Sequence, residues 1–493
     1  MSKLVYFLLS IAVALLFSVS TGIIITIIFG IITGYVICKK AKNYEEKNFL
    51  RNIYFIVYIL GIAIAMVHFY LAAIIKNDSD LIGDASAYSS HGAYIAEVLT
   101  NKKVNVEKNY TDMEELYLVR NIYKGKLPPY GIYRMDFMTY LNGFFYAFFG
   151  YSPLMIKFLN SILGIIGCFL IYFWIKDTFG EKQAKIALLL ILFLPSRLIW
   201  STSGAKDTLV FFAFSLALFL FFKLNKKIGL LWTCAILFAA CVKYDFVYIF
   251  LAFIIAICLL KRKEIISLLT SFILIKLAFI LIHEVRPQFF WPFIIALGIA
   301  SFVLIKRGKS ILIFSMVVLS LFLHPKIDMN FIKAQYQAIT DEVIGTHRGR
   351  SQQYYVKSQY KIYPDRFYNK NISIYRSPIT LNELFISYLI GMSYHYFSPF
   401  PWELSTKNML IGYIQMPVIY LLLPFIAIGI IIGFRHHKRE TMAYLFFIFI
   451  ISSIVAMASG NVGSLFRHRD MVMPFFIAFG AIGLTKIFTM RHQ

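Results

Sequence analysis

The chain has 493 residues, of which 59% are hydrophobic and 17% aromatic, and its mean hydropathy is +0.71. This composition excludes a soluble globular protein and indicates a polytopic membrane protein. The net charge of +24 would suggest nucleic-acid binding in a soluble protein, but here most Lys and Arg lie in short segments between apolar runs. We therefore expect contact with membrane lipids and no nucleic-acid partner.

Apolar runs of membrane-spanning length recur from end to end and predict an all-α chain with about fourteen transmembrane helices. No linker divides the chain, so we expect residues 1–493 to form a single polytopic membrane domain. The predicted helices cover residues 4–19, 21–38, 52–75, 153–175, 184–200, 206–223, 228–242, 245–260, 264–283, 288–305, 310–324, 409–433, 441–458 and 471–489.

The short basic segments between these helices predict the orientation. By the positive-inside rule they are cytoplasmic, which also places the N- and C-termini in the cytoplasm. Two long segments then face outward, the first external loop at 76–152 and the second at 325–408. Within them, the amphipathic stretches 138–150 and 383–397 are expected to lie along the membrane interface as anchoring helices.

The first external loop opens with LIGDASAYSSHGAYIAE, which places Asp84 at the start of a predicted helix. Tyr88 and His91 follow at i+4 and i+7, so one helical face carries an acid, a phenol and an imidazole. Taken alone, Asp84 is most simply an N-cap. In the context of an outer membrane face, it is also a candidate for proton transfer.

Two predicted external turns carry charged pairs between apolar helices. In LPSRLIWSTSGAKDTLVFF, Lys206 and Asp207 open the next helix, and Lys243 and Asp245 repeat the pattern. Charges at such depth are costly unless they pair or line a wet cavity. A mutual ion pair with helix capping and a shared polar site both remain open.

Near the C-terminus, SGNVGSLFRHRDMVMPFF is expected to place Arg467, His468 and Arg469 outside, at the N-terminal end of the last helix. Cations at a helix N-terminus suit a phosphate at headgroup level, whereas pairing with Asp470 or with anionic lipid is the alternative. The second external loop is basic and rich in tyrosine. It could form a folded cap or contact an anionic polymer or a sugar.

These elements together resemble the GT-C superfamily of membrane glycosyltransferases, which includes protein O-mannosyltransferases and aminoarabinose transferases. The resemblance rests on the GDAxxY motif, the amphipathic stretches after it, the FLPSRLIWSTSGAKDTL turn and the GNxGSLFRHR segment, over roughly 52–260 and 441–489. It differs in that Ala85 follows Asp84, where many relatives have a second acid.

The resemblance implies an inverting transfer of a sugar from a polyprenyl-phosphate carrier to a glycan, lipid or protein acceptor of the cell envelope, at the outer face of a bacterial plasma membrane. Asp84 would be the general base or would organise the acceptor and any divalent cation, Mg or Mn, whose requirement stays open. The cations that would stabilise the leaving phosphate are Arg467 and Arg469 first, then Lys206 and Lys243.

Two other functions fit the same layout. An O-antigen polymerase or ligase would depend on external arginines, with Arg348, Arg350, Arg366 and Arg376 as candidates. A lipid-linked oligosaccharide flippase is less favoured, because transporters tend to have internal repeats and polar residues at the membrane midplane. Motifs for ATP hydrolysis, dinucleotide binding and zinc proteolysis are absent from the sequence.

Overall fold

A computed structural model describes residues 21–76, 83–101, 137–223, 343–348, 360–368, 379–400 and 410–490. These residues form helices and contain no strand, which confirms the all-α prediction for this part of the chain. The predicted spans 4–19, 228–242, 245–260, 264–283, 288–305 and 310–324 lie outside the described residues.

Five of the described helices are long and apolar enough to cross a membrane. They are α2 (Thr21–Lys39), α3 (Tyr44–Lys76), α7 (Pro153–Phe179), α18 (Leu410–His436) and α19 (Lys438–Ala458). Two shorter apolar helices, α10 (Asp207–Phe222) and α21 (Met473–Met490), fall near the predicted spans 206–223 and 471–489. The membrane character is thus supported, while the number fourteen stays a prediction.

The helix predicted over 184–200 is broken in the structure. Its residues form α8 (Glu181–Leu192) and α9 (Pro195–Ser201), which meet at a bend of 64°. Pro195 explains the break, because a proline disfavours helical backbone in the residue before it and cannot donate a backbone hydrogen bond. The pair could be one broken span or a re-entrant loop.

The chain divides into two compact units, and the boundary passes through α7 and α10. The first unit comprises residues 1–170, 192–215 and 241–243, and the second comprises residues 171–191, 216–240 and 244–493.

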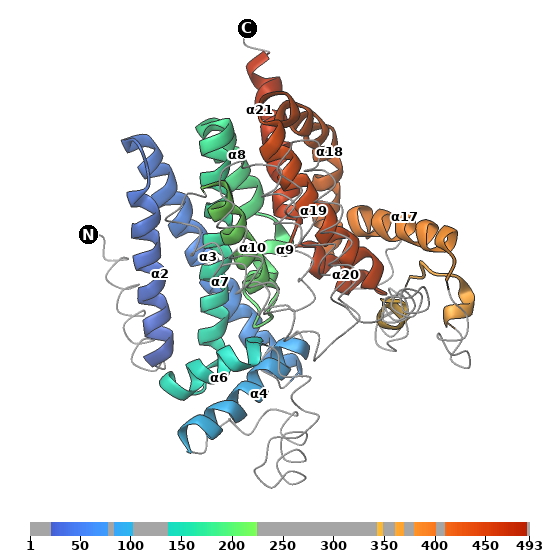
Figure 1. The fold of residues 1–493 in the computed structure, drawn as a ribbon. Helices are drawn as coiled ribbons and strands as arrows, with labels where there is room; N and C mark the ends of the chain where they lie inside the picture. The colour runs from blue at the N-terminus through green and yellow to red at the C-terminus, as the bar shows by residue number, and fades with distance from the viewer. Residues whose placement is uncertain are drawn as a thin grey trace, which may run out of the picture. The chain divides into compact units, whose positions relative to one another are not determined.

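In the first unit, α2 packs antiparallel to α3 through two tyrosines. Tyr54 Oη donates to Gly30 O at 2.5 Å and Tyr58 Oη to Ile27 O at 3.0 Å. Two further helices, α4 (Gly83–Thr100) and α6 (Phe137–Phe149), lie side by side across one end of this layer (Figure 1). The 13 residues of α6 are too few to span a bilayer, as predicted for 138–150.

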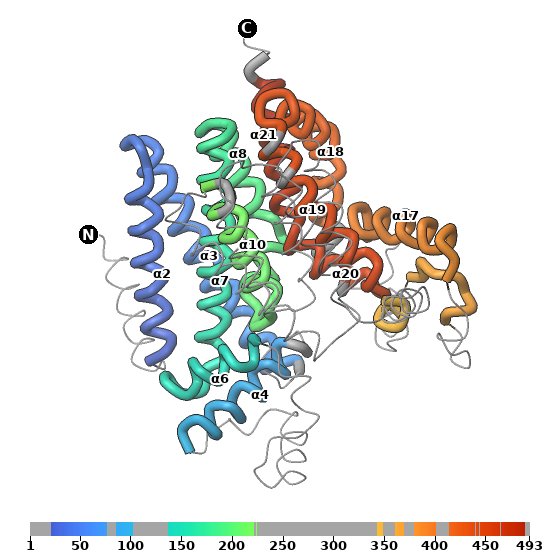
Figure 2. The backbone as a smooth tube through the Cα atoms, in the orientation of Figure 1, coloured from blue at the N-terminus to red at the C-terminus, as the bar shows by residue number. Residues whose placement is uncertain are grey.

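In the second unit, α18 and α21 run together along their length, as the tube in Figure 2 shows. Glycine permits this close approach, since a Cβ on Gly429 would overlap the carbonyl of Phe479 and one on Gly483 that of Phe425. The helices α17 (Leu381–Phe397) and α20 (Val462–Arg469) pack with α19 at one end of this group.

The described part of residues 325–408, which are predicted to face outward, is folded around buried tyrosines. Tyr360 stacks on Tyr394 with ring centroids 4.2 Å apart, and Tyr363 Oη donates to Met457 O at 3.0 Å. Both Tyr360 and Tyr363 are buried. These aromatic side chains therefore form a core, which favours the folded-cap interpretation over a surface for stacking sugars.

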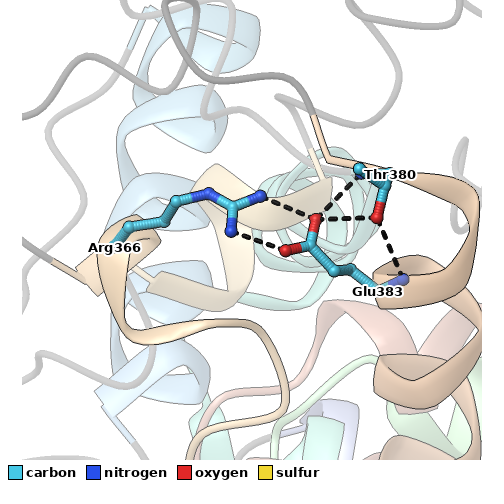
Figure 3. A network of polar contacts seen from close by, with 3 residues as sticks. All are labelled: Arg366, Thr380 and Glu383. Carbon is cyan, nitrogen blue, oxygen red and sulfur yellow. Dashed lines mark hydrogen bonds and ion pairs between the residues drawn. The ribbon is translucent and has the colours of Figure 1, made fainter.

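The start of α17 is fixed by a capping box joined to an ion pair (Figure 3). Arg366, in the short 3₁₀ helix η4 (Asp365–Tyr368), pairs with both carboxylate oxygens of Glu383 at 2.6 Å. Glu383 also accepts the backbone N–H of Thr380 at 2.9 Å, while Thr380 Oγ1 accepts that of Glu383. The bidentate Arg366 side chain lowers the pKa of Glu383 to about 2.

Candidate functional site

Helix α4 carries the candidate acid and is held in place by α6. Asn142 Nδ2 donates to Tyr88 O at 3.1 Å, and Ser89 Oγ lies 2.9 Å from Tyr146 Oη. The backbones meet at Gly92, where a Cβ would lie 2.7 Å from that of Asn142. The position of α4 is therefore determined by polar contacts and close packing.

Asp84 lies in the first turn of α4, just after the helix begins at Gly83. Its side chain is outside the described residues. Helical geometry still places Asp84, Tyr88 and His91 along one face, because they are spaced by four and three residues. The side chains of Tyr88 and His91 are both half-buried.

The turn before α10 is shaped by polar contacts with α7 and α9. Asn160 Nδ2 donates to Ser203 O at 2.8 Å and to Ala205 O at 3.0 Å. Arg197 Nη2 donates to Thr208 Oγ1 at 2.9 Å, and its guanidinium lies 4.3 Å from the ring centroid of Phe211. These contacts define the backbone that presents Lys206.

Two residues predicted for the site meet in the first unit. Lys206 Nζ lies 5.9 Å from the ring centroid of Tyr88, within cation–π range. Lys206 is half-buried, and Asp207, the first residue of α10, is buried. Helix α4 and the Lys206 turn, which are far apart in sequence, are therefore neighbours.

Three further residues of the first unit escaped the sequence prediction. Lys157 and Asn160 of α7 and Arg197 of α9 are 1%, 1% and 3% exposed. Lys157 and Arg197 are buried cations near the ends of apolar helices, a placement that in membrane proteins usually marks a functional or paired group. The sequence did contain the signal, because both interrupt otherwise apolar runs.

The basic C-terminal segment differs from its prediction. Arg467, His468 and Arg469 form the last turn of α20, and the final helix α21 begins only at Met473. The expected placement at the N-terminus of the last helix is therefore wrong, and with it the contribution of that helix to an anion site. Cations in the last turn of a helix instead stabilise that helix, because they interact favourably with its dipole.

Arg469 is buried and clamps the C-terminal end of α17. Its Nη1 donates to Ser398 O at 2.5 Å and to His395 O at 3.2 Å, and its Nη2 lies 3.2 Å from Met416 Sδ. Burial lowers the pKa of Arg469 to about 10, opposed by Tyr420 and Asp470, so the guanidinium stays protonated at neutral pH. These contacts favour a structural role for Arg469.

Arg467 is half-buried and His468 is buried, and each has at least one further interaction. They belong to the second unit, so their predicted role toward a lipid phosphate remains a prediction. Lys243 and Asp245 lie outside the described residues.

His395 is fully buried, and neither ring nitrogen has a hydrogen-bond partner within the described part of the chain. Burial, and secondarily the charge of Arg469, lowers the pKa of His395 to about 3. The imidazole is therefore neutral at physiological pH.

A divalent-cation site finds no support in the described residues, which hold no group of three His, Cys, Asp or Glu side chains able to bind a metal ion. Because the Asp84 side chain is not among them, the requirement for Mg or Mn stays open.

Comparison with known proteins adds no relative to this picture: no family model, curated protein or solved structure matches the chain. The geometry of the chain itself therefore carries the functional argument.

Proposed function

We propose that the chain is a membrane glycosyltransferase that moves a sugar, with inversion, from a polyprenyl-phosphate carrier to an acceptor of the cell envelope. The acceptor is a glycan, a lipid or a protein. In this proposal the chain spans a bacterial plasma membrane about fourteen times, with both termini in the cytoplasm and the reaction at the outer face. The fold is of the GT-C kind.

The observation that carries the proposal is the meeting of Tyr88 and Lys206. The distance of 5.9 Å from Lys206 Nζ to the Tyr88 ring brings a cation to the helical face that also includes Asp84. Buried Lys157, Arg197 and Asp207 belong to the same unit. Charged groups buried near the ends of apolar helices in membrane proteins are usually paired or functional, and their presence in this unit supports the proposal.

The proposed chemistry assigns each group a step. Asp84 takes the proton from the acceptor hydroxyl as that oxygen attacks the anomeric carbon. The bond from the anomeric carbon to the phosphate oxygen breaks on the opposite face, and the polyprenyl phosphate leaves with the electron pair. Lys206 stabilises the charge that develops on this phosphate. The bond changes balance as written, and the requirement for Mg or Mn stays open.

The polymerase alternative loses one of its four candidate arginines. Arg366 is held by Glu383 through two hydrogen bonds of 2.6 Å, so its guanidinium is already engaged within the loop. Arg350 and Arg376 lie outside the described residues. The described part of the second external loop is a packed structure and offers less support for a catalytic role.

The test is the release of free polyprenyl phosphate from candidate polyprenyl-phosphate sugars by the purified protein. We expect at least one donor to be consumed, and Lys206→Gln to lower its consumption by about 100-fold, as for loss of a group that stabilises developing charge. Lys361→Gln is the matched control, because Lys361 is exposed and pairs with Asp365. If no donor is consumed, or if both variants behave alike, the proposal is wrong. Loss in Arg350→Gln or Arg376→Gln without loss in Lys206→Gln would favour the polymerase.

A further inference from the structure

Helix α17 carries an apolar face that nothing in the described chain covers. Leu381, Phe385 and Leu389 follow one another at intervals of four residues and are 76%, 60% and 50% exposed. The exposed large apolar side chains of this helix are Leu381, Phe385, Ile386, Leu389, Ile390 and Phe397. They form a stripe along its length.

The opposite face of α17 packs on the end of α19. Ser387, Gly391 and His395 are buried at the same four-residue spacing. A Cβ on Gly391 would lie 3.0 Å from Ala456 O, so the two backbones are in close contact.

Hydroxyl pairs add to this contact and fix its position along α19. Tyr388 Oη lies 2.9 Å from Ser453 Oγ, and Tyr396 Oη donates to Ser452 Oγ at 2.9 Å. The contacts fall in the last two turns of α19, whose candidate span ends at Ala458.

The C-terminal end of α17 is attached to the start of the neighbouring span. Tyr420 Oη of α18 donates to Phe397 O, and Arg469 joins Ser398 O to Met416 Sδ. The candidate span in α18 begins at Ile414. Met416 and Tyr420 therefore lie within about 10 Å of the start of that span, at 1.5 Å per residue. Helix α17 is therefore fastened to α18 where that span starts and to α19 where that span ends.

Both attachments are at the same edge of the membrane, because α18 and α19 are consecutive spans joined at their other ends by a short connection. In Figure 1, α17 runs across the direction of α18 and α19. Its 17 residues give about 26 Å of helix, which is less than the hydrocarbon core of about 30 Å. Helix α18, to which α17 is attached, also exposes apolar side chains near the start of its span, at Ile414, Val418 and Leu421.

We propose that α17 is an in-plane membrane helix whose exposed stripe inserts into the lipid interface, and that it thereby sets the depth of α20. The occupant of the stripe is lipid, because α17 is attached to α18 at the boundary of the span, where α18 exposes apolar side chains of its own. Arg469 links the end of α17 to α20, so the insertion of α17 holds the basic turn of α20 at headgroup level. The inference does not depend on sugar transfer.

Depth-dependent quenching of tryptophan fluorescence tests this proposal without an activity assay. Phe385→Trp and Leu389→Trp place a reporter at two positions on the stripe, and Asp365→Trp is the control, because the Asp365 side chain is 85% exposed beside Lys361. The full-length proteins are reconstituted into vesicles whose lipids carry bromine either near the glycerol end or near the methyl end of the acyl chain. The emission of the wild-type tryptophans is subtracted.

We expect the emission added at 385 and 389 to be lost most with bromine near the glycerol end, as for a helix about 5–10 Å into the headgroup boundary. The emission added at 365 stays unchanged. Strongest quenching by the methyl-end bromine, or no quenching at either stripe position, overturns the proposal. Protection from bromine that disappears as the protein is diluted into excess lipid would show that a second copy covers the stripe, which also overturns it.

Discussion

Replacing Arg469 with methionine separates the structural role of this side chain from the phosphate-binding role predicted from sequence. The variant removes the donors to His395 O and Ser398 O, at 3.2 and 2.5 Å, and leaves both carbonyls in a buried environment. A hydrogen bond from a charged donor contributes about 1.5–3 kcal/mol, so two of them give about 3–6 kcal/mol.

Part of this loss is recovered, because methionine also removes the cost of burying a guanidinium. We expect a net loss of about 2–3 kcal/mol in the local stability at the end of α17. Since 1.4 kcal/mol corresponds to a factor of ten, local opening should become about 30- to 140-fold more frequent.

Hydrogen exchange read by mass spectrometry measures this opening at the backbone N–H of Ser398, which donates to Tyr394 O at 3.0 Å. Arg435→Met is the matched control, because Arg435 is exposed in the last turn of α18 and should leave this exchange unchanged. Unchanged exchange in Arg469→Met would refute the clamp. A loss of donor consumption without faster exchange would restore the predicted phosphate contact.

Three further predictions concern other contacts. Gly483→Ala gains up to about 1 kcal/mol of helix propensity, but it places a Cβ against Phe425 O at a cost of about 1–3 kcal/mol. The variant protein should therefore aggregate at a lower temperature than the wild type. Gly463→Ala is the control and should aggregate at the wild-type temperature, because its Cβ would lie 3.6 Å from the nearest neighbouring atom. Because the pKa of Glu383 is lowered to about 2, its contribution to stability is complete above about pH 5 and is lost as the pH falls toward 2. Protection from hydrogen exchange at the start of α17 should decrease over this pH range in the wild type. In Glu383→Gln, the same protection should not depend on pH. Asn160→Ala leaves two carbonyls of the Lys206 turn unpaired, so consumption of the sugar donor should fall. Asn160→Asp keeps the shape of the side chain but lacks the amide N–H groups, so its donor consumption should be low as well.

Each of these predictions has a contrary outcome. Equal aggregation temperatures for the two glycine variants would show that α18 and α21 separate without cost. If acid does not change the exchange protection of α17 in the wild type, the ion pair between Arg366 and Glu383 does not stabilise this helix. Normal activity of Asn160→Ala would show that the turn before α10 holds its shape by other contacts.

The spans that sequence located well are those in which long apolar runs end at charged or polar residues. The predictions 21–38, 153–175, 409–433 and 441–458 correspond to α2, α7, α18 and α19 within a few residues at each end. Hydrophobicity determines these segments because only a helix satisfies its own backbone hydrogen bonds in lipid. The predicted anchors 138–150 and 383–397 likewise correspond to α6 and α17.

Elsewhere the boundaries depended on local capping, which hydrophobicity does not report. Helix α3 begins at Tyr44 rather than near residue 52, because Asn43 Oδ1 accepts the backbone N–H of Glu46 at 2.7 Å. Glu46 in turn accepts the backbone N–H of Lys42 at 2.8 Å. The sequence contained this signal in the Asn43 to Glu46 spacing, as it contained Pro195 at the break between α8 and α9.

The candidate site was predicted in part. The sequence analysis placed Tyr88 and Lys206 in one candidate site, and in the structure the Lys206 ammonium group lies 5.9 Å from the centroid of the Tyr88 ring. It did not identify Lys157 and Arg197. Each interrupts an apolar run, but no spacing in the sequence relates either cation to the other residues of the site. The sequence analysis assigned Arg469 to a phosphate. The carbonyls that this side chain binds lie at the end of α17, about 70 residues earlier, and this pairing depends on tertiary structure that the sequence does not reveal.

The central claim is tested most directly by donor consumption in Asp84→Asn, measured beside the wild type in the same vesicles. Asparagine keeps the shape of the side chain and removes its ability to accept a proton. The account predicts that release of free polyprenyl phosphate falls by about 100-fold or more, as for loss of a general base. Release at the wild-type rate would contradict the assignment of Asp84 and the mechanism built on it.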